Sequence, residues 1–298
     1  MAERVLVTGA GGYIGSHVVD TLVEMGYSVL AVDLKDTDIN SNAKFLKVDI
    51  FSEAEDLFDR LERPDRIIHL AWRDGFVHNS PTHLEYLPKH YNFINAMVDK
   101  GVKSISVMGS MHEVGFFEGA INENTPTNPS SLYGISKNSL RQALKTLNLS
   151  KDFTFHWLRG YYILGDDTKN NSIFTKILQK AAEGKREFPF TTGTNKYDFI
   201  DIDDLALEIA LASVQDDVTG EINCCTGKPV ALKDKVEEFI KNLNLDIELK
   251  YGVFPERPYD SKIVYGDNKK IKQVLLNSAS VYDDEISKRI EKLVSNLG

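Results

Sequence analysis

Cysteine is scarce in this sequence of 298 residues: only Cys224 and Cys225 occur, and they are adjacent. Adjacent cysteines cannot tie distant parts of the chain together, so a disulfide framework is excluded. Side chains of neighbouring strand residues point to opposite faces, so we interpret the pair as buried strand residues and not as a redox pair. The seven histidines show no metal-ligand spacing, and no metal site is predicted.

Long apolar runs are also lacking. No run approaches the ~18 residues that a membrane helix requires, and the hydrophobic start Val5–Val7 is too short for a signal peptide. Basic residues are fewer than acidic ones, 35 against 44, so the formal net charge is -9 at pH 7. This balance argues against nucleic acid or an anionic membrane as the main partner, although a few local donors suffice to hold an anionic small molecule. We expect a cytoplasmic protein.

The first half of the chain contains a regular alternation of short β-branched runs with amphipathic segments. This alternation is typical of βαβ units and predicts an α/β fold with a doubly wound parallel sheet. After residue 160, helical stretches alternate with irregular pieces, which indicates a smaller mixed α/β domain. We predict one domain over residues 1–160 and a second over 161–298, with residues 197–224 returning to the first. The expected strands are Arg4–Thr8, Ser28–Val32, Lys44–Val48, Arg66–Leu70, Ser104–Met108 and Phe153–Leu158, and the expected helices include Ile14–Met25, Ile173–Glu183, Asp203–Ser213 and Lys233–Leu243.

A glycine-rich turn, Thr8-Gly9-Ala10-Gly11-Gly12-Tyr13-Ile14-Gly15, follows the first expected strand. Gly9 permits a tight turn, Gly12 lets the backbone approach a pyrophosphate, and Gly15 lets helix and strand pack closely. The helix that follows presents free N–H groups and a positive dipole end to phosphates. This context predicts a dinucleotide site of the Rossmann type. The alternative is a tight turn without a ligand.

Asp33 ends the second expected strand, where an acidic residue accepts hydrogen bonds from the adenosine ribose. Its charge would also repel a 2′-phosphate, so NAD(H) is favoured over NADP(H). Asp49 and Ile50 follow the third strand and are placed to contact the adenine. The alternative for Asp33 is a solvated loop residue.

Tyr133 and Lys137 are four residues apart, which places both on one face of a helix. A free tyrosine has a pKa of about 10, so poising it near pH 7 requires a shift of about 3 units, or about 4 kcal/mol. A lysine ammonium and an oxidised nicotinamide would both favour the phenolate. Tyr133 would then exchange a proton with a sugar hydroxyl or ketone while hydride moves to or from the nicotinamide. Ser110, at the end of the fifth strand, would bind the reacting oxygen.

These motifs resemble the extended short-chain dehydrogenase/reductase family, and within it the nucleotide-sugar epimerase/dehydratase/reductase branch. The resemblance covers essentially the whole chain. It implies that the cofactor is held by Gly9, Gly12, Tyr13, Ile14, Gly15, Asp33, Asp49, Ile50, Leu70, Ala71, Tyr133 and Lys137. The segments that carry it are the glycine turn, His69–Ala71, Ser110–Gly115, Tyr133–Lys137, Leu158–Gly165, Asp198–Asp204, Pro255–Asp260 and Gly266–Asp267.

The resemblance also implies a nucleoside-diphosphate sugar as substrate and a homodimer formed through the helix that bears Tyr133. Asn171 and Arg257 fall where relatives contact the diphosphate, a task that suits the fixed charge and fork of arginine. The predicted substrate-binding residues are Ser110, His112, Tyr162, Asn171, Tyr197 and Arg257. A loop or helix-cap role is the alternative for Asn171, and a surface position is the alternative for Arg257.

Departures from the family pattern narrow the reaction. The dehydratases carry an Asp-Glu pair where this chain has Met111 and His112. Because Met111 cannot transfer a proton, the sequence argues against dehydration. The reductases that also invert C3 and C5 carry a histidine at the position that aligns with Ser172. This difference argues against inversion of those two carbons. Tyr162 replaces an asparagine and Tyr197 an arginine of the C4 epimerases, and both changes add bulk to the sugar pocket. His112 is either a second acid or base, or a packing residue.

We therefore predict an NAD(H)-dependent oxidoreductase that acts at C4 of a nucleoside-diphosphate sugar and reduces a 4-keto-6-deoxy sugar. The close alternative is a C4 epimerase with tightly bound NAD, and a remote one is a non-catalytic NAD-binding regulatory protein. The loop Trp72–Gly75, after the fourth strand, is placed to border the nicotinamide. Within it, Arg73 is either a substrate contact or a solvated charge.

Overall fold

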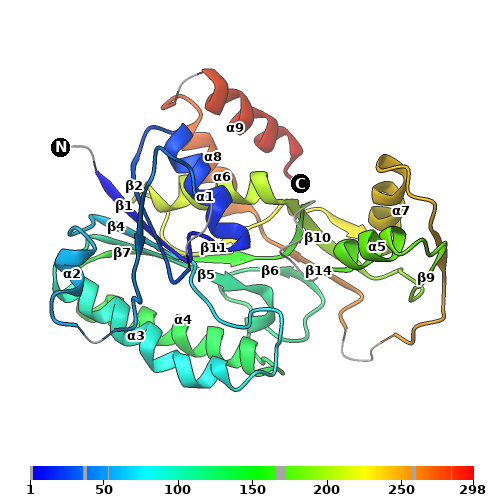
Figure 1. Cartoon of the computed structure of the whole chain (residues 1–298), viewed down its shortest axis with the longest axis horizontal. Coiled ribbons are helices and arrows are strands. Elements are labelled where there is room, and N and C mark those ends of the chain that lie inside the picture. Colours follow the sequence, from blue (N-terminus) through cyan, green and yellow to red (C-terminus); the bar gives the residue numbers. More distant parts are fainter. Residues whose placement is uncertain (1–2, 36–38, 53, 166–171, 257–259, 283) are drawn as a thin grey trace.

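A seven-stranded sheet, parallel at every pairing, lies at the centre of the structure (Figure 1). The computed structural model describes residues 3–35, 39–52, 54–165, 172–256, 260–282 and 284–298. The strands run in the order β11-β7-β5-β4-β1-β2-β3. Their bounds are β1 Arg4–Thr8, β2 Ser28–Asp33, β3 Lys44–Lys47, β4 Arg66–His69, β5 Ser104–Ser110, β7 Thr154–Gly160 and β11 Gly220–Cys224.

The strand order reverses at β1, which pairs with β2 on one side and β4 on the other. The connections on the two sides of β1 therefore run to opposite halves of the sheet, and a crevice opens at the carboxyl ends of β1 and β4. Ligands usually bind at such a crevice in this class of sheet. The glycine turn follows β1 directly and therefore lies at this crevice.

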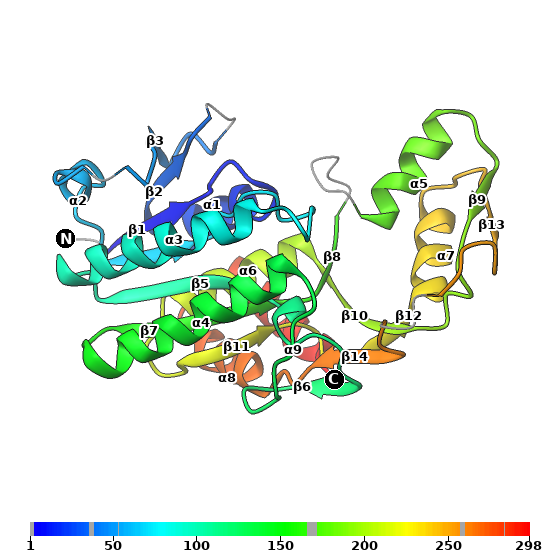
Figure 2. The same cartoon turned by 90° about the horizontal axis from the view of Figure 1, so that it is seen from below.

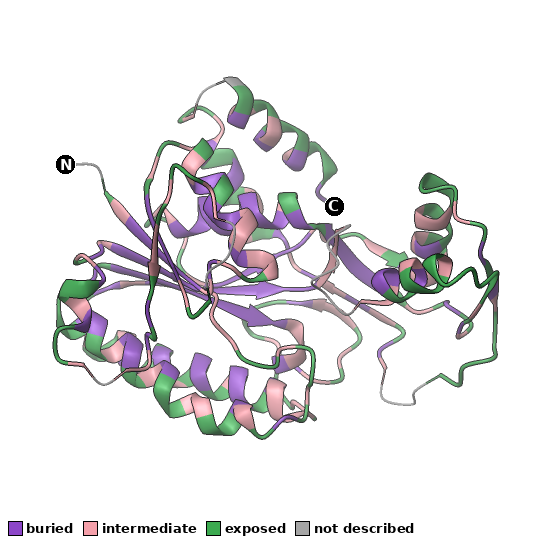
Figure 3. Ribbon diagram, viewed as in Figure 1, coloured by how far each residue is buried: buried purple, intermediate pink, exposed green. Residues whose placement is uncertain are grey.

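Helices cover both faces of the large sheet, whose strands are mostly buried (Figure 3). The apolar side chains between helices and strands form two separate cores. One core joins the sheet to α1, α6, α8 and α9, and the other joins it to α2, α3 and α4. The bounds of these helices are α1 Tyr13–Glu24, α2 Leu57–Arg60, α3 Thr82–Asp99, α4 Leu132–Ser150, α6 Ile202–Ser213, α8 Lys269–Ser278 and α9 Asp284–Asn296.

A second, mixed sheet lies beside the first and leads to a smaller lobe with α5 and α7 (Figure 2). Its strands run β12-β10-β14-β6, and β8 pairs with β10, whereas β9 and β13 form a separate two-stranded sheet. The prediction of a doubly wound parallel sheet with a smaller α/β unit is confirmed. The bounds are η1 Met111–Glu113, β6 Gly119–Ile121, β8 Tyr162–Leu164, α5 Ile173–Ala182, β9 Glu187–Pro189, β10 Lys196–Asp201, β12 Pro229–Ala231, α7 Leu232–Asn242, β13 Glu248–Lys250 and β14 Ile263–Gly266.

Residues 197–224, which were predicted to return to the first domain, are divided between the two sheets. Strand β10 belongs to the second sheet, whereas α6 packs on α1 and β11 forms the edge of the large sheet. The second sheet also includes β6 from the N-terminal half. The limits of the two domains stay a prediction, because the chain passes between the sheets more than once.

Local sequence explains where helices α4 and α5 begin. Ser131 caps α4 by accepting a hydrogen bond from Gly134 N at 3.1 Å. Ser172 caps α5 in the same way, through Thr175 N at 3.2 Å, so this residue has a structural role of its own. Within the described part of the chain, no helix is both long enough and apolar enough to cross a bilayer.

Candidate active site

The glycine turn forms a tight cradle between β1 and α1. Gly9 has a φ of 69°, and a Cβ atom there would lie 2.7 Å from Ala71 N. A Cβ atom at Gly15 would collide with the carbonyl oxygen of Gly9, so α1 rests directly on the turn. Gly12 precedes α1 without a side-chain cap, which leaves N–H groups of the first helical turn available to a phosphate. This geometry suits a pyrophosphate.

Asp33 lies at the end of β2 and faces the turn. One carboxylate oxygen accepts a hydrogen bond from Gly11 N at 3.0 Å, and the other accepts from Leu34 N at 2.7 Å. Asp33, Asp49 and Ile50 line the same cavity of about 510 Å³ as the glycine turn. The Asp33 carboxylate suits an adenosine ribose and opposes a 2′-phosphate, while Lys35 and Arg73 also line this cavity.

A larger cavity of about 670 Å³ continues from the turn to the carboxyl end of β5. It brings Ser110, at the end of β5, together with Tyr133 and Lys137 of α4. The two cavities share Gly9, Gly12, Leu70 and Trp72, so a dinucleotide in the cradle would extend toward Tyr133. The other predicted site residues in the wall of the larger cavity are Tyr13, Ile14, Gly15, His112 and Tyr162.

Desolvation dominates the electrostatics of the Tyr133–Lys137 pair. It raises the pKa of Tyr133 to about 12, against the opposing effect of a hydrogen bond with Ser110, and the charge of Glu113 raises it further. Desolvation also lowers the pKa of Lys137 to about 7, and Glu113 opposes that shift. The predicted lowering of the Tyr133 pKa by Lys137 is therefore not seen in the protein alone.

Three of the seven histidines, His78, His83 and His112, have rings beside Tyr133, and two more, His69 and His90, pack together next to Trp72, which the sequence did not reveal. The His78 ring stacks on Tyr133 at 5.4 Å and 12°, and the His112 ring lies 4.5 Å from His78. Desolvation, helped by the charge of His78, lowers the pKa of His112 to about 4, so His112 is neutral near pH 7. Its backbone N–H donates to Ser110 Oγ at 3.3 Å.

Glu113, which sequence reasoning also missed, fixes the turn that follows Ser110. It is fully buried in η1 and accepts hydrogen bonds from Arg159 Nε at 2.6 Å and Trp157 Nε1 at 2.8 Å. This buried ion pair ties η1 to β7 immediately behind the predicted catalytic residues. No local sequence signal distinguishes Glu113 from a surface glutamate.

The predicted substrate contacts divide into three groups. Tyr162 lies in the cavity wall, whereas Tyr197 is buried behind it, with ring centroids 4.4 Å apart. The Tyr197 hydroxyl accepts a hydrogen bond from Asn195 Nδ2 at 3.3 Å, so Tyr197 supports Tyr162 and does not itself line the cavity. Asn171 and Arg257 lie outside the described residues.

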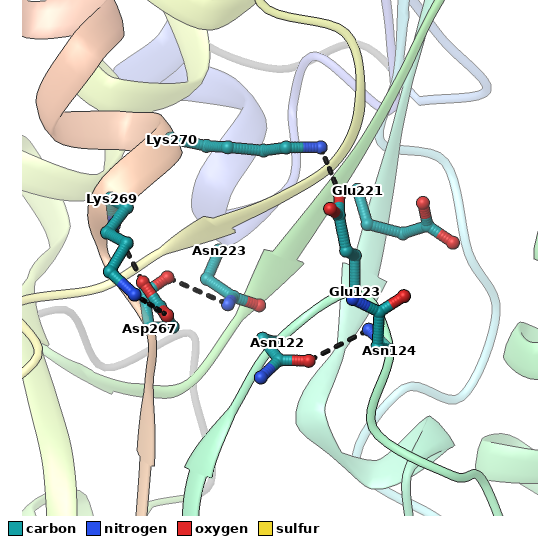
Figure 4. Close-up of a pocket in the computed structure, with 8 residues that line it drawn as sticks. All are labelled: Asn122, Glu123, Asn124, Glu221, Asn223, Asp267, Lys269 and Lys270. Atoms are coloured by element: carbon teal, nitrogen blue, oxygen red, sulfur yellow. Dashed lines mark hydrogen bonds and ion pairs between the residues drawn. The ribbon is translucent and has the colours of Figure 1, made fainter.

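Another cavity, of about 270 Å³, lies between β11, the segment after β6 and the start of α8 (Figure 4). Its charged side chains already have partners: Lys270 pairs with Glu123, and Lys269 pairs with Asp267 at 3.1 Å. Glu221 pairs with Arg141 and Lys145. The cavity contains none of the predicted catalytic residues.

Comparisons with known proteins agree with this geometry. The sequence matches the NAD dependent epimerase/dehydratase family over residues 5–225. It is 45% identical over 268 residues to a protein of Aggregatibacter actinomycetemcomitans named dTDP-6-deoxy-L-talose 4-dehydrogenase (NAD(+)), a match that covers 88% of this chain and 99% of that protein. It is 27% identical over 308 residues to a UDP-glucose 4-epimerase of Lactobacillus helveticus, covering 91% of each.

The fold is also that of solved structures of the same kind. A UDP-N-acetylglucosamine 4-epimerase from Methanobrevibacter ruminantium M1 superposes with a TM-score of 0.79 and 23% identity, covering 99% of this chain and 98% of that one. Similarity at that identity supports the fold alone. The predicted family resemblance and the prediction of an enzyme are confirmed, and the family is NAD dependent by its description. The chain therefore belongs to the NAD dependent epimerase/dehydratase family.

Proposed function

We propose that this chain is an NAD(H)-dependent oxidoreductase that interconverts a ketone and an alcohol at C4 of a nucleoside-diphosphate 6-deoxy sugar. The observation that carries the proposal is the larger cavity, in which Ser110, Tyr133 and Lys137 meet the glycine turn. A hydride carrier and a proton carrier are then available to one carbonyl group, which is what ketone reduction requires.

NAD(H), when bound, supplies or accepts the hydride. In the direction of reduction, the Tyr133 hydroxyl donates its proton to the C4 oxygen, and the Ser110 hydroxyl donates a hydrogen bond to the same oxygen. The Lys137 ammonium binds the nicotinamide ribose and favours the phenolate that Tyr133 becomes. In the reverse direction the Tyr133 phenolate takes the proton from the C4 hydroxyl, so one set of residues serves both directions.

The substrate class is supported by the relative at 45% identity, whose name specifies a dTDP-linked 6-deoxy sugar oxidised at C4. The cavity wall agrees with a sugar that lacks a C6 hydroxyl, because Phe76 and Val77 bring exposed apolar surface to it. Reduction of the 4-keto-6-deoxy sugar is the direction we propose for the chain.

A C4 epimerase is the second candidate, favoured by the similarity to the UDP-glucose 4-epimerase of Lactobacillus helveticus. An epimerase recycles its cofactor within one turnover, so it consumes no NADH. Tyr162 argues for the reductase, because its ring adds bulk to the cavity in which a 4-keto intermediate would have to rotate.

The test is an assay of NADH absorbance with a dTDP-4-keto-6-deoxy sugar, and of the reverse reaction with dTDP-6-deoxy-L-talose and NAD+. Stoichiometric loss of NADH supports the proposal. Interconversion of two C4 epimers without net change in NADH would establish the epimerase. If the Tyr133→Phe variant kept every activity of the wild type, the remaining hypothesis of a non-catalytic NAD-binding protein would replace both.

We also propose a cytoplasmic homodimer that pairs through α3 and α4. These helices pack together on one face of the large sheet, and their outer surface carries small exposed residues such as Ala96 and Ser139, which allow close approach of a partner helix. Light scattering during size-exclusion chromatography measures the mass, and cell fractionation measures the location. A monomer at micromolar concentration would contradict the dimer.

A further inference from the structure

The Lys137 side chain is almost completely buried, and two groups hold its ammonium. Nζ donates a hydrogen bond to the backbone carbonyl of Met108 at 2.7 Å, and it lies 3.8 Å from the centre of the Trp72 ring. Within the described residues no carboxylate lies close enough to form an ion pair with Lys137. The face of an indole ring carries partial negative charge and attracts a cation, most strongly where water is excluded.

Trp72 is itself fixed by groups from α3. Its indole N–H donates to His83 Nδ1 at 3.1 Å, and the His90 ring stacks on the indole at 4.4 Å and 12°. His90 is hydrogen-bonded to His69 at 2.8 Å, and His69 to Thr8 Oγ1 at 2.8 Å. The indole is therefore linked to the end of β1, immediately before the glycine turn, and cannot turn away from Lys137 without breaking these contacts.

Other charges around the ammonium do not replace the indole. Glu113 acts on Lys137 from η1, but its carboxylate is already paired with Arg159. His69 and His90 are neutral near pH 7, because desolvation and the charge of Lys137 lower the pKa of both imidazoles. Tyr133, whose ring centre lies 5.9 Å from the ammonium, is also neutral at that pH, since its pKa is raised to about 12.

We propose that Trp72 is a positioning residue for Lys137: its indole face holds the ammonium beside Tyr133 and stabilises the charged form. Desolvation, partly opposed by the charge of Glu113, brings the pKa of Lys137 to about 7, so a modest additional interaction decides whether the side chain is charged near neutral pH. The inference rests on the proposed function only for the part that Lys137 has in the reaction; the contact between Trp72 and Lys137 does not depend on that function.

The direct test titrates Lys137 in the full-length protein by NMR of isotope-labelled lysine side chains, with the Lys137→Met variant used to assign the signal. Trp72 is replaced in turn by tryptophan with one, two and three fluorine atoms on the ring, which weaken the negative face while preserving shape and the N–H group. We expect the pKa of Lys137 to fall in steps by about one unit in total, since one unit corresponds to about 1.4 kcal/mol, within the range of a desolvated cation–π interaction. The same pKa throughout the series would overturn the proposal.

Conventional variants provide a second measurement. Trp72→Leu should shift the pKa of Lys137 at least as far as the full fluorination series, and Trp72→Phe should shift it less. Phe93→Leu is the matched control, because Phe93 packs on His69 in the same cluster, with ring centroids 5.5 Å apart, without touching Lys137. If Phe93→Leu moved the pKa as far as Trp72→Leu, the effect would come from general loosening and the proposal would fail.

Activity then separates this inference from the proposed function. In an active enzyme, the limb of the kcat/KM pH profile that reports Lys137 should move with its pKa across the fluorinated series. If no sugar nucleotide is turned over but the pKa still falls with fluorination, the proposed function fails and the role of Trp72 stands. If the enzyme is active and the pKa of Lys137 stays constant, the proposed function stands and the role of Trp72 fails.

Discussion

Replacing Glu113 by glutamine should destabilise the whole protein, although the change preserves the shape of the side chain. Glu113 is fully buried, and its carboxylate accepts hydrogen bonds from Arg159 and Trp157. Loss of the charge leaves the Arg159 guanidinium buried without a carboxylate partner, and its other hydrogen-bond partner among the described residues, Asn223, is neutral. The amide of glutamine also places an N–H₂ group where both neighbours are donors. Removing one partner of a buried ion pair costs roughly 3–5 kcal/mol.

Urea unfolding followed by circular dichroism measures this cost. With a denaturant slope of about 3 kcal/mol/M, a loss of about 3 kcal/mol lowers the midpoint by about 1 M. Glu183→Gln is a suitable control, since it breaks an exposed pair with Lys180, and it should leave the midpoint unchanged. The double variant Glu113→Gln/Arg159→Met should recover part of the loss, because no buried charge remains. A midpoint for Glu113→Gln equal to that of the wild type would refute the reasoning.

Three further predictions concern the cofactor cradle and the core. Gly15→Ala should weaken NADH binding more than tenfold, because its Cβ atom meets the Gly9 carbonyl; fluorescence titration measures the affinity, and unchanged binding would contradict the packing of α1 on the turn. Asp33→Ser should improve the affinity for NADP+ relative to NAD+ by about tenfold, or about 1.4 kcal/mol, and a constant ratio would show that Asp33 does not face the ribose. Burial raises the pKa of Glu208 well above its ordinary value, although the backbone of Cys225 opposes the shift. The folded protein therefore binds this proton more tightly than the unfolded chain, so the associated stability is present below the unfolded pKa and is lost as pH rises through the folded pKa. Glu208→Gln should gain stability relative to the wild type between pH 5 and pH 8 in urea unfolding, and a constant difference between the two proteins would refute the assignment.

Features set by neighbouring residues were predictable from the sequence. The bounds expected for the first strand are those found, Arg4–Thr8, and the spacing of Tyr133 and Lys137 correctly placed both on α4. Each depends on local periodicity, which the chain shows directly. The position of Ser110 at the end of β5 was predictable for the same reason.

Features that depend on distant segments were not predictable. His69, His83, His90 and Trp72 come from two elements and the loop between them. No spacing in the sequence shows that Trp72 packs on Lys137 or that the histidines form one cluster with Trp72. In the protein alone the pKa of Tyr133 is raised and not lowered, which was not predictable because the sequence displays the charge of Lys137 but not the loss of water around both groups. Charge can be counted along a chain, whereas desolvation follows only from the packed structure.

The position of β11 at the edge of the large sheet has a consequence for synthesis of the chain. When residues 1–160 have left the ribosome, β7 still exposes its unpaired edge, and the sheet lacks α6, whose buried side chains include Leu205, Ile209 and Leu211. A nascent chain of that length is therefore prone to bind chaperones or to pair with other open strands. A fragment cut at residue 160 should aggregate when expressed alone, whereas co-expression with the remainder can restore a soluble complex.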